Sequence, residues 1–183
     1  MIITKDLKFK YNDQASFSFP DIKLAKDENL LIIGNSGIGK TTLLHLLAGL
    51  LKSNSGLINL YEQDINNLTQ YQMDKFRGQN IGIVFQKPHF VNSLTVKENL
   101  QLAQYLGNKE DKNRVIDILS SLDILDKKNK KPKKLSQGEK QRASIAMAIV
   151  NSPKLILADE PTSSLDDENC ERVIRLLKKQ ASE

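Results

Sequence analysis

The sequence predicts an α/β domain, and two short apolar runs with a helical stretch between them are the observations that predict it. Residues 30–33 (LLII) lead into a glycine-rich turn, and residues 155–158 (LILA) lead into two acidic residues. Runs of this length with such boundaries are typical of buried strands. The stretch at about 88–150 has helical periodicity, which predicts a helical lobe inserted into the α/β core.

The first part of the chain is predicted to combine short strands with one helix. Residues 2–9 and 17–24 are interpreted as edge strands, since Pro20 cannot donate a hydrogen bond to a central ladder. Leucines at three- and four-residue spacing predict a helix that begins at Lys40. The turn residues at 53–56 (SNSG) end this helix.

The remaining elements are predicted from the same patterns. Apolar runs at 57–60 and 81–85 predict two further strands. Helices are predicted at 95–106, 112–125, 138–150 and 167–180, with Thr95 and Asp111 as N-terminal caps of the first two.

Composition excludes several classes of protein. The 183 residues are 39% hydrophobic and 27% charged, which is ordinary globular usage. No stretch approaches the roughly 18 uncharged apolar residues of a membrane-spanning helix, and the N-terminus has no signal-peptide core. The single cysteine, Cys170, excludes an internal disulfide and a multi-cysteine zinc site, so a reduced, cytosolic setting is expected. Cys170 is interpreted as inert, and His45 as a packing residue of its helix.

Positive charge is concentrated in one segment. The net charge is +5, and residues 127–134 (KKNKKPKK) contain six lysines, so the rest of the chain is nearly neutral. A basic segment suggests nucleic acid or anionic lipid as a partner, although a solvated connector is the favoured interpretation here. No aromatic residue is interleaved with the lysines, which disfavours a surface that stacks nucleic-acid bases.

Residues 34–41 (GNSGIGKT) match the phosphate-binding pattern G-x-x-x-x-G-K-[ST] between a predicted strand and a predicted helix. Glycines allow backbone N–H groups to curl around a phosphate, and the helix dipole favours the same anion. Lys40 is expected to reach the β- and γ-phosphates, Thr41 to bind Mg²⁺, and Thr42 to add a phosphate contact. The predicted nucleotide-binding residues are Gly34, Asn35, Ser36, Gly37, Ile38, Gly39, Lys40, Thr41 and Thr42.

Two acidic residues, Asp159 and Glu160, end the LILA run. Unpaired carboxylates at a strand end are costly unless water or a partner satisfies them, and a magnesium nucleotide would explain both. Asp159 is predicted to bind the Mg²⁺ through water, and Glu160 to orient or deprotonate an attacking water. A solvated strand end is the alternative.

A helix start at 135–139 (LSQGE) is the third motif. Ser136 followed three residues later by Glu139 is a capping box, which by itself has only a structural role. A helix N-terminus with serine and glycine is also a good anion site.

Together these motifs resemble those of the nucleotide-binding domain of ATP-binding-cassette (ABC) transporters, over the whole chain. Residues 34–42 match the Walker A loop, LILADE matches Walker B, and LSQGE matches the family signature. Gln86, at the end of IGIVFQ, matches the Q-loop glutamine. The resemblance implies one ABC ATPase domain over residues 1–183: a P-loop NTPase core with a parallel sheet, an N-terminal antiparallel β subdomain, and an inserted α-helical subdomain at about 88–150.

The resemblance also implies roles for individual residues. Tyr11 occupies the place of an aromatic that stacks on adenine, although simple packing is the alternative. The implied catalytic residues are Glu160 and Gln86, and the implied metal-binding residues are Thr41, Gln86 and Asp159. The signature residues, expected to contact ATP bound to a second copy, are Leu135, Ser136, Gln137, Gly138 and Glu139, and the D-loop residue is Asp166.

The function implied by the resemblance is that of an ATP-hydrolysing subunit that binds Mg-ATP, forms an ATP-dependent homodimer and drives a permease from the cytoplasmic face of the membrane. Residues 73–100 look like cassettes of the lipoprotein-releasing, macrolide-export and cell-division type. Two alternatives remain at this point: a cassette acting on nucleic acid, the ribosome or iron–sulfur assembly, and a partner module that binds ATP but hydrolyses it poorly. A nucleic-acid partner is disfavoured.

Three residues depart from the family pattern: Gln137 replaces a glycine, Glu139 a glutamine and Met147 an arginine. We expect these changes to tune the site without abolishing it. The family's switch histidine has no counterpart among the 23 residues that follow Glu160. Either a fragment of a longer chain or a natural truncation would explain this, and we expect low turnover.

Overall fold

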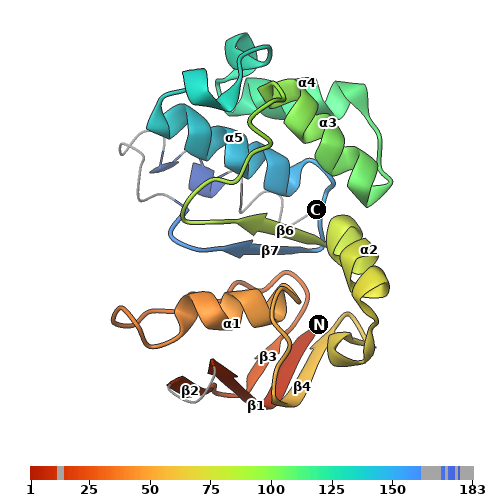
Figure 1. Ribbon diagram of the computed structural model, residues 1–183, viewed down its shortest axis with the longest axis vertical. Coiled ribbons are helices and arrows are strands. Elements are labelled where there is room, and N and C mark those ends of the chain that lie inside the picture. The colour runs from red at the N-terminus through yellow and green to blue at the C-terminus, as the bar shows by residue number, and fades with distance from the viewer. Residues whose placement is uncertain (12–14, 162–169, 172, 176, 178–183) are drawn as a thin grey trace. The chain divides into compact units, whose positions relative to one another are not determined.

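The computed structural model describes most of the chain, namely residues 1–11, 15–161, 170, 171, 173–175 and 177 (Figure 1). The chain divides into two compact units, Met1–Asp74 and Lys75–Glu183. The α/β class predicted from the sequence is confirmed, with an antiparallel sheet in the first unit and a parallel strand pair in the second. Among the described residues, no helix has the length and apolar character that spanning a bilayer requires.

Strand β1 (Ile2–Tyr11) is the centre of the antiparallel sheet. It pairs with β4 (Ser55–Leu60) along one side and with β2 (Ala15–Ser18) and β3 (Ile22–Leu24) along the other. The prediction that residues 2–9 form an edge strand is therefore wrong. A single strand's residues give no information on how many neighbours pair with it, because pairing is non-local.

Strands β2 and β3 confirm the edge position predicted for residues 17–24, since each pairs with β1 alone. Pro20 lies between them and explains the interruption, because it has no N–H for a ladder. The strand predicted at 57–60 is confirmed within β4. The next strand, β5 (Gln63–Asp64), pairs antiparallel with β4 at the edge of the sheet.

Residues 30–33 differ from the prediction. No strand forms there, and the side chains are exposed, with Leu31 and Ile33 each 81% accessible. An apolar run becomes a strand only when a neighbouring strand pairs with it, and no described strand does so. The expectation of a buried strand before the glycine turn is therefore wrong in this structure.

Helix α1 (Lys40–Leu47) begins at the predicted residue and buries Leu43, Leu46 and Leu47. It ends before the predicted turn at 53–56, because Gly49 adopts a left-handed conformation with φ of 62°. A Cβ at Gly49 would lie 2.5 Å from the end of the flexible Met73 side chain, which would have to move, so the left-handed backbone is the stronger reason for glycine at this turn.

In the second unit, β6 (Ile81–Val84) and β7 (Leu155–Ala158) pair in parallel, with Ile81 opposite Leu155 and Val84 opposite Ala158. This confirms the strands predicted at 81–85 and 155–158. Because parallel strands run in one direction, the residues that follow both strands lie at the same edge of the pair. Those residues include the predicted Gln86, Asp159 and Glu160.

Three helices of the second unit confirm the predicted helices and caps: α3 (Val96–Gly107), α4 (Lys112–Ser121) and α5 (Gln137–Ile149). The Thr95 side chain accepts the Glu98 N–H, and the Asp111 side chain accepts the N–H groups of Asn113 and Arg114. Helix α4 ends at Ser121 rather than at residue 125. The three helices lie on one side of the β6–β7 pair and bury a common apolar core with it (Figure 1).

Helix α2 (Gln70–Asn80) was not predicted from the sequence. Of its residues only Met73 is buried, so the apolar stripe that would reveal it is missing. The helix predicted at 167–180 lies mostly outside the described residues, and those described within it (170, 171, 173–175 and 177) are helical.

Candidate active site

The glycine turn before α1 has the backbone geometry of a phosphate-binding loop. Gly37 and Gly39 adopt φ values of 84° and 100°, a region that favours glycine. Gly39 is the N-terminal cap of α1 and provides no side-chain hydrogen bond to the first turn of the helix. A helix N-terminus that follows such a glycine turn is a typical place for an anion, because backbone N–H groups and the helix dipole point toward it.

Lys40 folds back across this loop. Its Nζ donates to the carbonyl oxygens of Gly34 at 2.6 Å and Asn35 at 2.9 Å. Both partners are neutral, and a charged phosphate oxygen forms a stronger hydrogen bond with an ammonium than a carbonyl does. A bound triphosphate would therefore compete well for Lys40.

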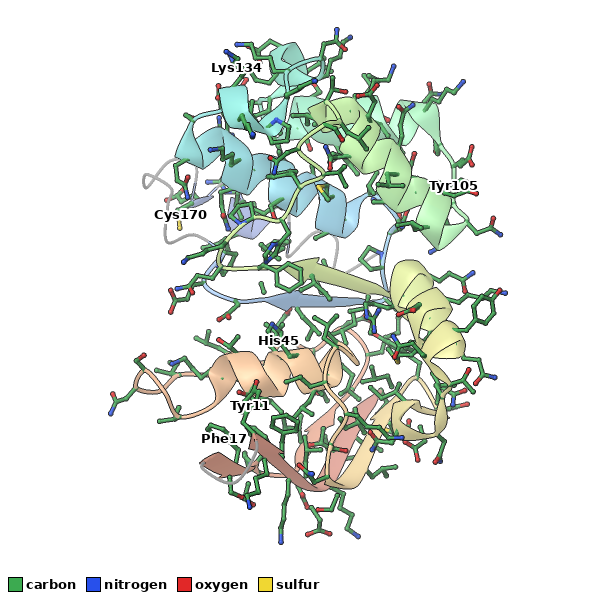
Figure 2. All side chains as sticks on the ribbon, in the orientation of Figure 1. Tyr11, Phe17, His45, Tyr105, Lys134 and Cys170 are labelled. Carbon is green, nitrogen blue, oxygen red and sulfur yellow. The ribbon has the colours of Figure 1, made fainter. Side chains whose placement is uncertain are left out.

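Tyr11 lies close to the start of α1, as its predicted role requires. Its hydroxyl is 3.4 Å from the Oγ1 of Thr42, where either oxygen can donate. The ring packs edge-on against Phe9 at a centroid distance of 4.6 Å and against Phe17 at 6.2 Å (Figure 2). Tyr11 as a whole is 43% exposed, so the residue combines packing against the protein with accessibility to a ligand.

Phe17 is a neighbour of the loop that sequence reasoning missed. A Cβ built on Gly39 would lie 2.7 Å from its ring, and Phe17 stacks on Phe19 with centroids 6.1 Å apart. The sequence signal that could have revealed it is the spacing of Phe17 and Phe19 two residues apart, which places both rings on one face of an extended segment. The two rings pack against the turn and limit the space available for a side chain at Gly39.

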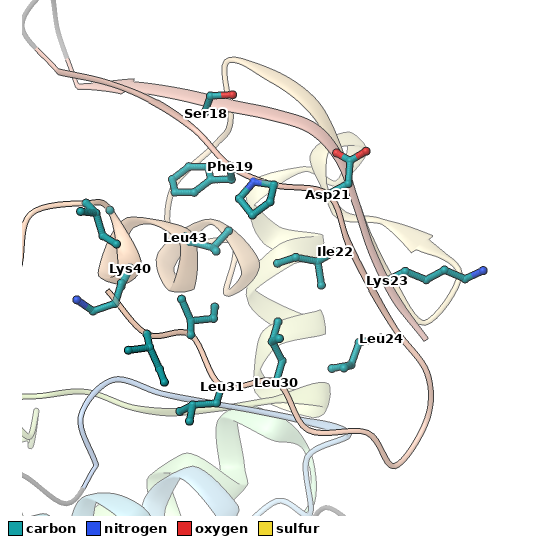
Figure 3. A pocket seen from close by; sticks show the side chains of 15 residues that line it. Ser18, Phe19, Asp21, Ile22, Lys23, Leu24, Leu30, Leu31, Lys40 and Leu43 are labelled. Atoms are coloured by element: carbon teal, nitrogen blue, oxygen red, sulfur yellow. The ribbon is translucent and has the colours of Figure 1, made fainter. Parts of the chain in front are cut away.

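A hollow of about 550 Å³ lies beside the loop in the first unit (Figure 3). Its lining is mostly apolar and includes Phe19, Leu24, Leu30, Leu31 and Leu43, with Lys40 as one of its few charged residues. An apolar lining is a poor environment for a triphosphate. The hollow itself is therefore a less suitable phosphate site than the backbone N–H groups of the loop, of which Ile38, Gly39 and Lys40 line part of the hollow.

At the ends of β6 and β7, the structure brings Gln86 and Glu160 together across 74 residues of sequence. The Gln86 Nε2 donates to the Glu160 Oε2 at 2.8 Å. Asp159 continues the ladder, with its N–H donating to the Val84 carbonyl at 2.9 Å. Glu160 itself has a φ of 46°, which is uncommon for a residue with a side chain.

Oxygen atoms predominate among the side-chain ligands at this edge. Asp159 and Glu160 supply carboxylates and Gln86 supplies an amide oxygen, which are the ligand types that Mg²⁺ prefers. Among the described residues, no cluster of three or more His, Cys, Asp or Glu side chains could bind a metal without further ligands. The oxygen chemistry of Asp159, Glu160 and Gln86 fits a Mg²⁺ ion.

The predicted capping box at Ser136 is present. The Ser136 Oγ accepts the Glu139 N–H at 3.2 Å, and the Ser136 N–H donates to the Glu139 Oε2 at 2.7 Å. Of the other signature residues, Leu135 is buried, Gln137 is exposed and Gly138 is partly exposed. The Ser136 N–H, followed by the nearby Lys127 ammonium, lowers the pKa of the Glu139 carboxyl.

Gln141 is a second residue that the motifs did not reveal. Its side chain is fully buried in α5, and its Nε2 donates to the Pro161 carbonyl at 3.0 Å. Pro161 directly follows Glu160, so this hydrogen bond links the signature helix to the segment of the acidic residues. Asp166, the predicted D-loop residue, lies outside the described residues.

A family model described as ABC transporter matches residues 19–163, well over half of the chain. The chain belongs to the ABC transporter family. Its relatives include the lipoprotein-releasing system ATP-binding proteins LolD of Buchnera aphidicola subsp. Schizaphis graminum and of Legionella pneumophila (strain Lens). The first is 36% identical over 178 residues, covering 96% of this chain and 78% of that protein. The second is 38% identical over 160 residues, covering 86% and 70%.

Solved structures of ABC cassettes agree with this assignment. The dimeric structure of MJ0796, a bacterial ABC transporter cassette, has a TM-score of 0.92 at 30% identity and covers 100% of this chain and 83% of its own. A post-hydrolysis dimer of the same cassette, bound to ADP and Pi, has the same TM-score. The prediction of an ATP-binding and ATP-hydrolysing ABC transporter subunit is confirmed and favoured over a non-transport cassette, and the predicted likeness to cassettes of the lipoprotein-releasing / macrolide-export type is supported by relatives named as lipoprotein-releasing ATP-binding proteins.

Proposed function

We propose that two copies of this ABC cassette close head to tail on Mg-ATP and that Glu160 activates the water that hydrolyses it. Each nucleotide would lie between the loop 34–42 of one copy and the signature 135–139 of the other. The observation that carries the proposal is the 2.8 Å hydrogen bond between Gln86 and Glu160, because it joins the two residues that must act on one water. The dimeric state of MJ0796 supports the arrangement.

Different residues of this chain would carry out the separate steps of ATP hydrolysis. The Glu160 carboxylate would accept a proton from the water as its oxygen attacks the γ-phosphorus. The bond from the γ-phosphorus to the oxygen that bridges it to the β-phosphate then breaks, leaving ADP and phosphate. Gln86 would orient the water, and Lys40 with the loop N–H groups would stabilise the charge on the transferred phosphoryl group.

Thr41, Gln86 and Asp159 are the residues that would bind Mg²⁺, which supplies charge neutralisation on the phosphates when it is bound. Tyr11 would present its exposed ring face to adenine, because Thr42 and the neighbouring phenylalanines fix its position beside the loop.

The partner is proposed to be a membrane permease, which would place the cassette at the cytoplasmic membrane surface. Support comes from the two relatives, whose name describes ATP-binding proteins of a lipoprotein-releasing system. More specifically, we propose that the permease partner of this chain belongs to a lipoprotein-releasing system.

The test is the ATP dependence of dimerisation in the Glu160→Gln variant, measured by light scattering after size exclusion. The variant cannot accept the proton, so it should accumulate as a dimer with ATP and Mg²⁺ and remain monomeric with ADP. The Lys40→Ala/Glu160→Gln double variant is the matched control and should not dimerise. A Glu160→Gln protein that binds ATP and stays monomeric would refute the sandwich. Steady-state turnover of the unmodified chain then measures how fast it hydrolyses ATP.

A further inference from the structure

The lysine-rich segment 127–134 is displayed on a defined scaffold rather than on a loose connector. The carbonyls of Lys128 and Lys130 accept the N–H groups of Lys97 and Val96, both at 2.9 Å, at the start of α3. Pro132 and Leu135 are buried and anchor the far end of the segment. The lysine side chains therefore project from an ordered backbone, and Lys134 lies at the periphery of its unit (Figure 2).

Among the described residues, Lys127 is the lysine of this segment that has carboxylate partners at close range. The Lys127 ammonium lies 2.5 Å from the Asp126 carboxylate and 3.4 Å from Glu139. In the part of the chain that the structure describes, Lys128, Lys133 and Lys134 have no ion pair. Lys130 and Lys131 influence Asp126 and Glu98 only through longer-range electrostatic attraction. The segment therefore carries a concentrated excess of positive charge that the nearby carboxylates compensate only in part.

The chemistry of this surface distinguishes among anionic partners. All its cations are lysines, which act as hydrated point charges, whereas planar two-point recognition of phosphate groups favours arginine. No aromatic residue lies among them to stack on a nucleic-acid base. Clustered lysines without either feature fit a diffuse array of anionic headgroups.

We propose that Lys128, Lys130, Lys131, Lys133 and Lys134 form a basic surface that docks on anionic phospholipid headgroups. The proposal rests on the proposed function in one respect: a permease partner brings the cassette to a membrane surface. The basic surface would then add an electrostatic attachment that is independent of the nucleotide.

The test is co-sedimentation of the full chain with phosphatidylcholine vesicles, with and without phosphatidylglycerol. Binding should require phosphatidylglycerol and should fall as salt is raised, because exposed charges are screened. Each lysine near an anionic surface is worth about fivefold in affinity, so replacing Lys130, Lys133 and Lys134 with glutamine should weaken binding roughly a hundredfold. The matched control replaces the exposed Lys5, Lys8 and Lys23 of the antiparallel sheet with glutamine and should bind as the unmodified chain does.

Three results would overturn the proposal: equal binding to neutral vesicles, equal loss in both triple variants, or displacement from vesicles by RNA at lower concentration than by soluble phosphatidylglycerol micelles. Circular dichroism of both variants excludes misfolding as the cause of any loss. The ATP-dependent dimer of Glu160→Gln is measured without vesicles. A dimer without vesicle binding therefore refutes only the basic surface, and vesicle binding without a dimer refutes only the sandwich.

Discussion

The Lys127 ammonium lies 3.4 Å from the carboxylate of Glu139, in the first turn of the signature helix. Glu139 replaces the glutamine of the family pattern, so it adds a negative charge beside the proposed contact with the γ-phosphate. Lys127 offsets only part of that charge, because it also pairs with Asp126 at 2.5 Å, and we infer that this ion pair lets the signature depart from the pattern and still approach a phosphate. We therefore interpret Lys127 as a residue that compensates the charge introduced by Glu139.

Lys127→Gln should therefore weaken ATP-dependent dimerisation, because the Glu139 carboxylate would then repel the triphosphate. The expected shift in the ATP concentration for half-maximal dimer is about two- to fivefold, the range of an exposed ion pair. The double variant Lys127→Gln/Glu139→Gln should recover the original ATP dependence. Lys128→Gln, which removes a neighbouring charge that has no ion pair, is the control. An uncorrected defect in the double variant would contradict the compensation.

The same pair predicts how stability depends on pH. Hydrogen bonding to Ser136 and the Lys127 ammonium lower the pKa of Glu139, so the stabilisation is present at neutral pH and is lost as pH falls through the pKa of the folded state. Hydrogen bonds to Asp126 and then Glu139 raise the pKa of Lys127, so its contribution is lost only as pH rises through that raised value. Urea unfolding should show the unmodified chain more stable than Glu139→Gln at pH about 7, with the difference shrinking as pH falls through the lowered pKa of Glu139. A difference that stays constant with pH would contradict this.

Gln141 offers a test of coupling between the signature helix and the acidic residues. Gln141→Met keeps the volume of the side chain but removes the donor to the Pro161 carbonyl. The other amide atom, Oε1, has no hydrogen-bond partner in the described structure, so its removal offsets part of the loss. We expect a change in unfolding free energy within about 1 kcal/mol, with a several-fold lower turnover number and an unchanged dissociation constant for ATP. A loss of stability without a change in turnover would assign Gln141 a purely structural role.

Whether an element could be predicted from the sequence depends on how far apart along the chain the interacting residues lie. The caps at Thr95, Asp111 and Ser136 were predicted correctly because each depends on hydrogen bonds within three residues. The edge position of residues 2–9 and the strand at 30–33 were wrong because both depend on distant pairing.

The site divides in the same way. The glycine turn and the acidic strand end were visible as local patterns, and the resemblance supplied Gln86 as their partner. Neither Phe17 nor Gln141 could be found in this manner, because each acts through a contact with a residue far along the chain. Only the folded structure shows that the Phe17 ring packs against Gly39 and that the buried Gln141 amide donates to the Pro161 carbonyl.

The two left-handed glycines of the phosphate loop allow backbone strain to be separated from crowding. Alanine at either position incurs about 1–2 kcal/mol for the left-handed conformation. At Gly37 nothing lies within 4 Å of the added Cβ, whereas at Gly39 the Phe17 ring lies 2.7 Å away. Gly39→Ala should therefore lower the midpoint of thermal unfolding by several degrees more than Gly37→Ala, measured without nucleotide. The Gly39→Ala/Phe17→Leu double variant should recover part of that excess, since a smaller side chain leaves room for the Cβ. Equal effects of the two alanines would show that Phe17 yields without cost and does not support the turn.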